Sequence, residues 1–121
     1  MNELPVIQKT YDLIKWYIPI IKKMPKHHKF GLGDRITLFL YQLLEDLIVA
    51  RYTKDKISLL ENLNAKLAIL RHQSRLLLDF KLIEENRYIY INTQLHEIGN
   101  EIGGWLKQQK QIQNSKATII V

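Results

Sequence analysis

One segment of this sequence constrains the fold more than any other, because its apolar residues repeat at helical spacing. Residues 55–83 contain neither proline nor glycine. Steps of three and four residues place one set of side chains on a single face of an α-helix. That set is Leu60, Leu63, Leu67, Leu70 and Leu77, with Ser74 on the same stripe. Such a helix must bury this face, so the segment predicts a helical protein with a leucine-lined core.

The N-terminal segment predicts a first helix over residues 5–24, with isoleucines recurring along one face. Pro5 suits the first helical turn, where the missing N–H costs nothing. Pro19 falls inside the predicted helix and should kink it or break it near residues 17–18.

Proline and glycine then interrupt the sequence and predict a loop over residues 25–33. Asp34 follows the loop directly and can cap a second helix by accepting its free N–H groups. This second helix should continue to about residue 52. A short junction then leads to Asp55, a plausible cap for the leucine-rich helix.

Polar residues 84–86 predict the next break, and a fourth helix follows with Ile91, Leu95 and Ile98 on its inner face. This helix should fade over residues 108–111, where glutamine and lysine replace the apolar residues.

Together these segments predict an all-α protein in which residues 1–113 form an antiparallel up-down-up-down four-helix bundle. The alternation of steps of three and four suits left-handed, knobs-into-holes packing. Residues 114–121 are expected to form a separate, disordered tail. Its apolar end, residues 118–121, is too short to fold alone but could pair with a partner.

The formal net charge of +6 and the isoelectric point near 9.6 favour a polyanionic partner. Nucleic acid comes first, ahead of an anionic membrane or an acidic protein. A solvated, lysine-rich surface is the simpler alternative. The absence of cysteine excludes disulfides and thiolate chemistry. No secretion signal or membrane span is visible, so a cytoplasmic protein is expected.

Metal-ligating and catalytic patterns are weak. The histidines are His27, His28, His72 and His96. They show neither the Glu-x-x-His step of metal-binding bundles nor the His-Glu-x-x-His pattern of zinc proteases. Gly31-Leu32-Gly33 follows a predicted helix and lacks the lysine of a phosphate-binding loop. Glu97 and Glu101 lie one helical turn apart, which is typical of a solvated face or of partners for nearby Lys and Arg. We therefore expect no metal, no cofactor and no catalytic residue.

Basic residues form a more informative pattern. A first group surrounds the predicted loop and consists of Lys22, Lys23, Lys26, Lys29 and Arg35, with His27 and His28 among them. A second group at the next junction consists of Arg51, Lys54 and Lys56. In an up-down bundle the first and third links share one end and the second junction lies at the other. With Arg71 and Arg75 midway between them, positive charge is expected along much of the molecule. These cations are candidates for contacts with phosphates.

Arg71 and Arg75 lie four residues apart on the leucine-rich helix and are therefore neighbours. Arginine gives bidentate contacts to phosphate, which makes this pair a candidate for nucleic-acid binding. The alternative is a surface charge or a salt bridge, for which the nearby acids are Glu45, Asp46 and Asp79. Apolar side chains share their stripe, which indicates an interface, a groove or both.

Glycines inside the fourth predicted helix, Gly99, Gly103 and Gly104, each cost about 1 kcal/mol relative to alanine. A helix usually keeps such residues where another helix approaches closely, and Trp105 would anchor that contact. We therefore expect close packing here, within the subunit or between subunits. The alternative is a helix end at Gly103 and Gly104, which would act as a C-cap.

Three segments, in order and at fitting spacing, resemble the accessory variability determinant of diversity-generating retroelements. The first is Ile18-Pro19-Ile20-Ile21 with Met24-Pro25-Lys26 and Phe30-Gly31-Leu32-Gly33-Asp34-Arg35. The second is Leu67-Ala68-Ile69-Leu70-Arg71 with Arg75-Leu76-Leu77. The third is Glu97-Ile98-Gly99 with Gly103-Gly104-Trp105-Leu106-Lys107. Proteins encoded in intervening sequences of ribosomal RNA genes share the bundle but match these motifs less well.

The resemblance implies a basic four-helix bundle that assembles into a homopentamer and has no catalytic centre. It implies association with the retroelement's reverse transcriptase and with template RNA or its DNA copy, while adenine-directed mutations are written into a variable gene. Arg71 and Arg75 lie where the family carries basic residues. Asn100 stands where the family has arginine, so the positive surface near the fourth helix is expected to be weaker. If the ribosomal relatives are the better guide, the chain is a protein-interaction scaffold without a nucleic-acid role.

Overall fold

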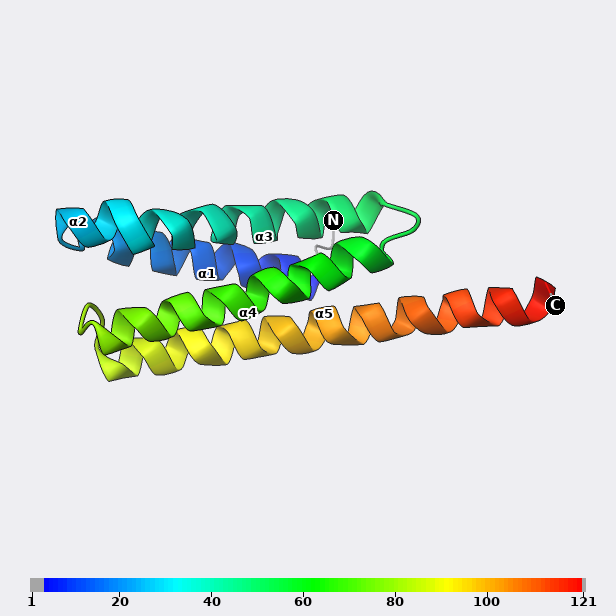
Figure 1. Ribbon diagram of the computed structural model, residues 1–121. Coiled ribbons are helices and arrows are strands. Elements are labelled where there is room, and N and C mark those ends of the chain that lie inside the picture. The colour runs from blue at the N-terminus through cyan, green and yellow to red at the C-terminus, as the bar shows by residue number, and fades with distance from the viewer. Residues whose placement is uncertain (1–3, 121) are drawn as a thin grey trace.

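The computed structural model describes the backbone of residues 4–120 and the side chains of residues 4–116. The described residues are helical apart from short links and contain no strand. The long helices are α1 (Pro5–Lys22), α3 (Asp34–Tyr52), α4 (Ile57–Asp79) and α5 (Glu85–Ile120). They lie side by side as a four-helix bundle (Figure 1), and the predicted all-α class is confirmed.

The links between the long helices lie at the two ends of the molecule. In Figure 1 the link between α3 and α4 lies at one end, and the short segment α2 (Lys26–His28) and the α4–α5 turn lie at the other. The rings of His28 and Phe80 are 5.9 Å apart between centroids, which independently places the first and third links together. Between the ends, α4 packs against α3 and α5, and α1 packs against α3 and α5.

The core contains the stripe that the sequence predicts. All the leucines of the α4 stripe are buried, and Ser74 is buried with them. Burying one leucine side chain contributes about 1.5–3 kcal/mol, so this face fixes α4 against its neighbours. The facing stripes on α3 and α5 include Leu40, Leu43, Leu47, Ile91, Leu95 and Ile98, all fully buried.

One polar contact lies inside this core. The hydroxyls of Tyr17 and Ser74 are 2.9 Å apart and hydrogen-bonded, and both side chains are buried. Burial disfavours the charged phenolate and therefore raises the pKa of Tyr17 above its ordinary value of 10.0, an effect that the hydrogen bond to Ser74 partly opposes. The bond satisfies both hydroxyls and fixes α1 relative to α4.

The predicted loop over residues 25–33 is wrong. Only residues 23–25 are non-helical, and α2, the π-helical segment η1 (Lys29–Gly33) and α3 follow one another without a break. Gly33 serves close packing, because a Cβ there would lie 2.9 Å from Cγ2 of Ile21. Asp34 continues the same helical backbone, and no side chain caps the start of α3, so its predicted capping role is also wrong.

Two further expectations concern Pro19 and Asp55. α1 continues through Pro19 without the break that was one alternative for this residue. Pro19 is exposed and only three residues from the end of α1, so its missing N–H removes one hydrogen bond from the last turn. Asp55 does not cap α4, which begins at Ile57 after Lys56 and has no capping side chain.

The turn between α4 and α5 occupies residues 80–84 and therefore begins before the predicted break at 84–86. Lys81 has a φ of 60°, in the left-handed region that usually favours glycine. The N–H of Leu82 donates to the carbonyl of Leu77 at 2.8 Å, which closes the helix end as a Schellman motif. The sequence gives no sign of this stop because a lysine occupies the position.

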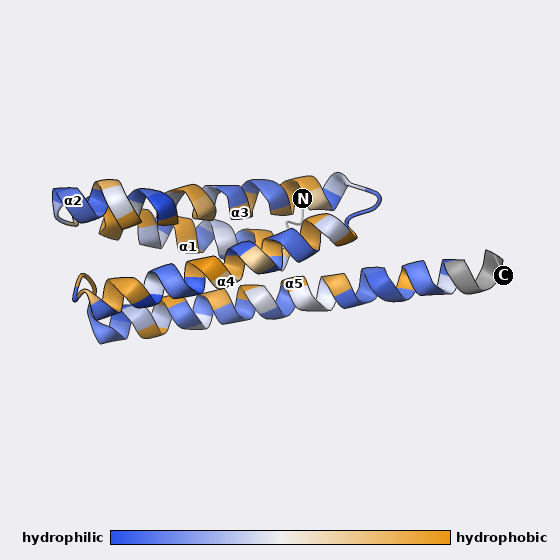
Figure 2. Ribbon diagram, viewed as in Figure 1, coloured by the Kyte–Doolittle hydropathy of each residue, from blue (hydrophilic) through white to orange (hydrophobic). Residues whose placement is uncertain are grey.

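α5 is longer than predicted. Its backbone is helical to Ile120 and projects beyond the other helices (Figure 1), so the end expected at residues 108–111 is wrong. Residues of this projecting part are mainly hydrophilic in Figure 2. The division of the chain into a domain over 1–113 and a tail over 114–121 stays a prediction, and Val121 lies outside the described residues.

Candidate nucleic-acid interface

The first group of predicted cations lies at the end of the bundle that holds α2. Figure 2 shows α2 in the hydrophilic colour at this end. The α4–α5 turn brings a further lysine to the same place through the contact between His28 and Phe80. We define the basic end by its cations: Lys22, Lys23, Lys26, Lys29, Arg35 and Lys81.

The cations of the basic end have no acidic partner within the described part of the chain. All of them are exposed except Lys29, which is half-buried. The Nζ of Lys29 lies 5.4 Å from the centroid of the Phe30 ring. Asp34, Glu84 and Glu85 lie in or directly after these links but form no ion pair with these cations. Their charge is therefore available to phosphate groups.

Arg71 is held against α5. Its Nη2 donates a hydrogen bond of 3.3 Å to the carbonyl oxygen of Leu95. The same nitrogen lies 2.8 Å from the position that a Cβ on Gly99 would occupy, so this glycine makes room for the guanidinium. Nε of Arg71 is buried and has no hydrogen-bond partner. The half-buried side chain thus joins α4 to α5 and shows only part of its charge to solvent.

Arg75 forms the salt bridge that was the alternative for this residue. Its Nε lies 3.2 Å from Oδ1 of Asp79, and its guanidinium lies 5.9 Å from the ring centroid of Tyr88. The hydrogen bond to Asp79, followed by that to Tyr88, raises the pKa of Arg75 above its ordinary value. Arg71 and Arg75 do lie together around a shallow depression with His72 and Tyr88. Phosphate binding by this pair stays a prediction.

Other cations along the helices are also paired. Nζ of Lys9 lies 3.1 Å from Glu97 and 3.8 Å from Glu101, which confirms the expectation that these carboxylates are partners for a nearby cation. Nζ of Lys66 lies 2.7 Å from Asp46, and both of these side chains are mostly buried. The charges of Lys9 and Lys66 are therefore compensated by carboxylates within the bundle.

The second predicted basic group lies at the opposite end, around the α3–α4 link. Nζ of Lys56 lies 5.0 Å from the centroid of the Trp105 ring, and the guanidinium of Arg51 lies 5.6 Å from the ring of Tyr52. A groove there is lined by Leu4, Pro5, Val6, Arg51, Lys56, Glu101, Gly104, Trp105 and Gln108. The tryptophan forms an apolar wall beside the cations.

The glycines of α5 have different surroundings. A Cβ on Gly99 would lie within 3 Å of Leu67 and Arg71, so α4 and α5 approach closely there. A Cβ on Gly103 or Gly104 would meet no atom within 4 Å beyond the local backbone. The alternative of a helix end at Gly103 and Gly104 is wrong, because α5 continues to Ile120. Both glycines lie inside α5, and no described residue fills the space beside them.

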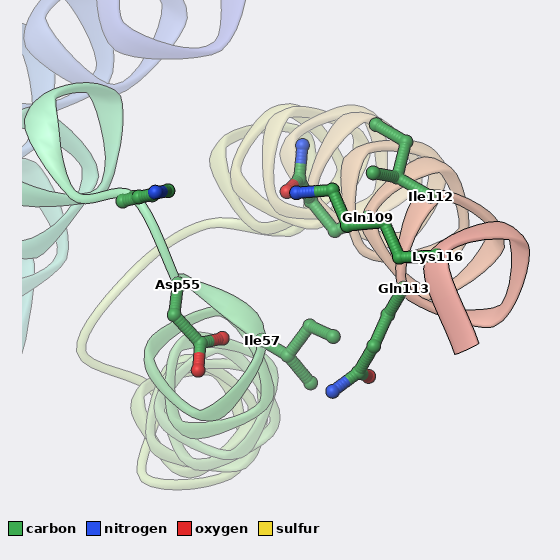
Figure 3. Close-up of a pocket in the computed structure, with 7 residues that line it drawn as sticks. Asp55, Ile57, Gln109, Ile112, Gln113 and Lys116 are labelled. Atoms are coloured by element: carbon green, nitrogen blue, oxygen red, sulfur yellow. The ribbon is translucent and has the colours of Figure 1, made fainter. Parts of the chain in front are cut away.

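A second groove lies between the start of α4 and the projecting part of α5 (Figure 3). In Figure 3 Asp55 and Ile57 face Gln109, Ile112, Gln113 and Lys116 across this groove. Its side chains are amides, isoleucines and single charges, without a nucleophile beside a base. Among the described residues, no three His, Asp or Glu side chains gather as a metal ion would require.

Sequence reasoning missed the exposed aromatic rings of the basic end. Phe30 is 62% exposed and Phe80 is 54% exposed. The available signal was position, because each phenylalanine is adjacent to a lysine in a predicted link or helix end, Lys29-Phe30 and Phe80-Lys81.

Comparisons with known proteins agree with the three sequence motifs. No curated protein matches the sequence. No helix formed by the described residues combines the length and apolar character needed to cross a bilayer. A family model described as bAvd-like matches residues 4–109, which include all of α1 to α4 and the first part of α5. The match confirms the resemblance to the accessory variability determinant. The chain therefore belongs to the bAvd-like family.

Proposed function

We propose that this protein is a non-catalytic accessory subunit of a diversity-generating retroelement. It binds the element's reverse transcriptase and its template RNA or DNA copy during mutagenic retrohoming. Membership of the bAvd-like family supports an accessory protein of this type. The observation that carries the nucleic-acid part of the proposal is the basic end, whose cations lack acidic partners among the described residues.

Binding at the basic end rests on phosphate contacts. Lysine and arginine attract phosphates without reading base edges, so RNA and DNA are both ligands. Lys26, Lys29 and Arg35 lie on the continuous helical backbone of α2, η1 and α3. Their Cα positions are fixed before binding, which lowers the ordering entropy that association must overcome. Arg71 and Arg75 extend the surface along α4, where Arg75 exchanges Asp79 for a phosphate.

We also propose that the subunit is an antiparallel up-down-up-down bundle that assembles into a homopentamer. The alternating placement of the links supports the up-down order. Gly103, Gly104 and Trp105 are candidates for a contact between subunits, because the two glycines weaken α5 without serving any contact inside the described chain.

A second candidate function is a protein-interaction scaffold with no nucleic-acid role. The outer face of α3 favours it, since apolar side chains at helical spacing are exposed there: Leu38, Tyr41, Ile48, Val49 and Tyr52. An exposed apolar patch of this kind marks a protein interface. In the accessory-subunit proposal the same face contacts a neighbouring subunit or the polymerase.

Salt dependence tests the nucleic-acid part of the proposal. Fluorescence anisotropy would measure binding of the full-length protein to labelled RNA at several salt concentrations. If about six cations contact phosphates, affinity should fall at least about 100-fold between about 50 and 200 mM salt. An affinity that ignores salt, or no binding at all, contradicts this part of the proposal.

Co-purification tests the protein partner. The accessory subunit should retain the reverse transcriptase encoded at the same locus when both are co-expressed and one is tagged. Retention of the polymerase without salt-dependent RNA binding would favour the scaffold. Failure to retain the polymerase would contradict the accessory role.

A further inference from the structure

The basic end carries exposed aromatic rings as well as unpaired cations. The chain has 3 phenylalanines, and 2 of them, Phe30 and Phe80, lie at this end with more than half of their surface exposed. The third, Phe39, packs against the core. Burying a phenylalanine contributes about 1.5–3 kcal/mol, so two rings left in water at the same end of the bundle are candidates for contact with a ligand.

The rings of this end form a row that joins two links. His27 and His28 have centroids 4.0 Å apart with an interplanar angle of 43°. His28 and Phe80 have centroids 5.9 Å apart with an angle of 31°. The row therefore runs from α2 in the first link to the end of α4 in the third. Phe30 follows these histidines closely in the sequence, and its ring lies next to Nζ of Lys29.

Cations are adjacent to these rings in the sequence. Lys22, Lys23 and Lys26 precede the histidines, and Lys81 follows Phe80. A nucleic acid presents two kinds of surface, charged phosphates and flat base faces. In a duplex the base faces are stacked on one another and only the terminal pairs are accessible. In a single strand every base can stack on an aromatic side chain while its phosphates contact lysine.

We propose that the basic end binds unpaired nucleotides of single-stranded nucleic acid, with Phe30 and Phe80 as stacking surfaces and the neighbouring lysines as phosphate contacts. This inference rests on the proposed nucleic-acid role and specifies its ligand. Phosphates supply affinity for any strand. The rings add a preference for strands whose bases are free.

Three labelled oligonucleotides of equal length, about 12 nucleotides, separate these contributions in an anisotropy titration of the full-length protein. The first is single-stranded, the second is the same sequence as a duplex, and the third is an abasic strand with the same number of phosphates. The single strand should bind at least about fivefold more tightly than the abasic strand, because stacking contributes about 1–3 kcal/mol per base.

The double variant Phe30→Ala/Phe80→Ala should bind the normal strand as weakly as the abasic strand and should leave abasic binding unchanged. Phe30→Tyr/Phe80→Tyr should retain the preference, because tyrosine keeps a stacking face. Tyr11→Ala is a matched control, since it removes an aromatic ring that is 50% exposed on α1, outside the basic end. Circular dichroism verifies that every variant remains helical.

Several outcomes overturn the inference. Equal binding of normal and abasic strands shows that phosphates alone are bound, and the proposed nucleic-acid role survives. An unchanged strand preference in the alanine variant removes the rings from the site. Loss of self-association or of the polymerase, with unchanged oligonucleotide binding, assigns the rings to a protein contact. Absence of binding to all three oligonucleotides overturns the nucleic-acid role itself.

Discussion

The basic end and the flanks of the bundle use the same residue types in opposite ways. On the flanks, Lys9, Lys66 and Lys110 each lie within ion-pair distance of a carboxylate on another helix. At the basic end no cation has such a partner among the described residues. A net charge of +6 is therefore not spread evenly. Where lysine meets acid across two helices it serves the fold, and where the helices end it remains free for a ligand.

Removal of three positive charges from each region should separate the two roles most strongly. Lys22→Gln/Lys23→Gln/Lys26→Gln should lower RNA affinity about 100-fold at about 0.1 M salt, because three phosphate contacts are lost. Lys9→Gln/Lys66→Gln/Lys110→Gln removes the same charge from the flanks, outside the proposed binding surface, and should change affinity by less than about threefold. Anisotropy titrations measure both. Equal losses would mean that total charge, and not its position, determines binding.

The free energy of unfolding should show the reverse order, with a larger loss from a variant on the flanks than from one at the basic end. Asp46→Asn leaves the mostly buried Lys66 without its partner and should lower the free energy of unfolding by about 1–2 kcal/mol. Lys26→Gln at the basic end should change it by less than about 0.5 kcal/mol. Urea unfolding followed by circular dichroism gives both values. A larger loss from Lys26→Gln would show that the basic end also holds the fold together.

At alkaline pH, the burial of Tyr17 should lower the free energy of unfolding. The folded pKa of Tyr17 is raised above 10.0, so the folded state keeps a proton that the unfolded state releases. This contribution is fully present below pH 10 and is lost as pH rises above it, at up to about 1.4 kcal/mol per pH unit. The difference between the wild type and Tyr17→Phe, measured by urea unfolding, should shrink above pH 10 because the variant lacks this loss. A constant difference would show that water reaches the hydroxyl.

Substitutions of the three glycines of α5 should have the smallest effects on stability. Gly103→Ala and Gly104→Ala have open space and should each raise stability by up to about 1 kcal/mol through helix propensity. Gly99→Ala should gain less or lose stability, because its Cβ would press on Leu67 and the guanidinium of Arg71. Thermal unfolding ranks the three variants. If the two open glycines behave like Gly99, they meet another subunit in solution, and a weaker assembly in sedimentation experiments would accompany the change.

Most of the fold could be predicted from the sequence because burial follows a simple period. The leucine stripe of α4 and the inner faces of α3 and α5 have the expected spacing. Helix ends were less predictable. Gly31 and Gly33 predict a loop, yet the backbone through both residues is helical. Gly33 allows the close approach of Ile21 and does not form a turn.

The candidate site was predictable only in part, because pairing is a tertiary property. The sequence places Arg75 four residues from both Arg71 and Asp79, and spacing alone does not decide which neighbour it contacts. In the structure, Arg75 forms a salt bridge with Asp79. Likewise, nothing local to Phe80 indicates that His28 lies beside it, since the two are joined only by the packing of the first and third links.

The π-helical segment η1 has a consequence for the orientation of the basic end. A π-helical turn holds more residues than an α-helical turn, so η1 accommodates extra sequence without breaking the rod that continues into α3. Each residue of an α-helix advances the chain by about 100° around its axis. A single deletion within η1 would thus rotate α2 by roughly a quarter of a revolution relative to α3. The side chain of Lys26 on α2 would then point in a different direction while the four long helices kept their places. The length of η1 therefore determines the direction in which this positive charge faces.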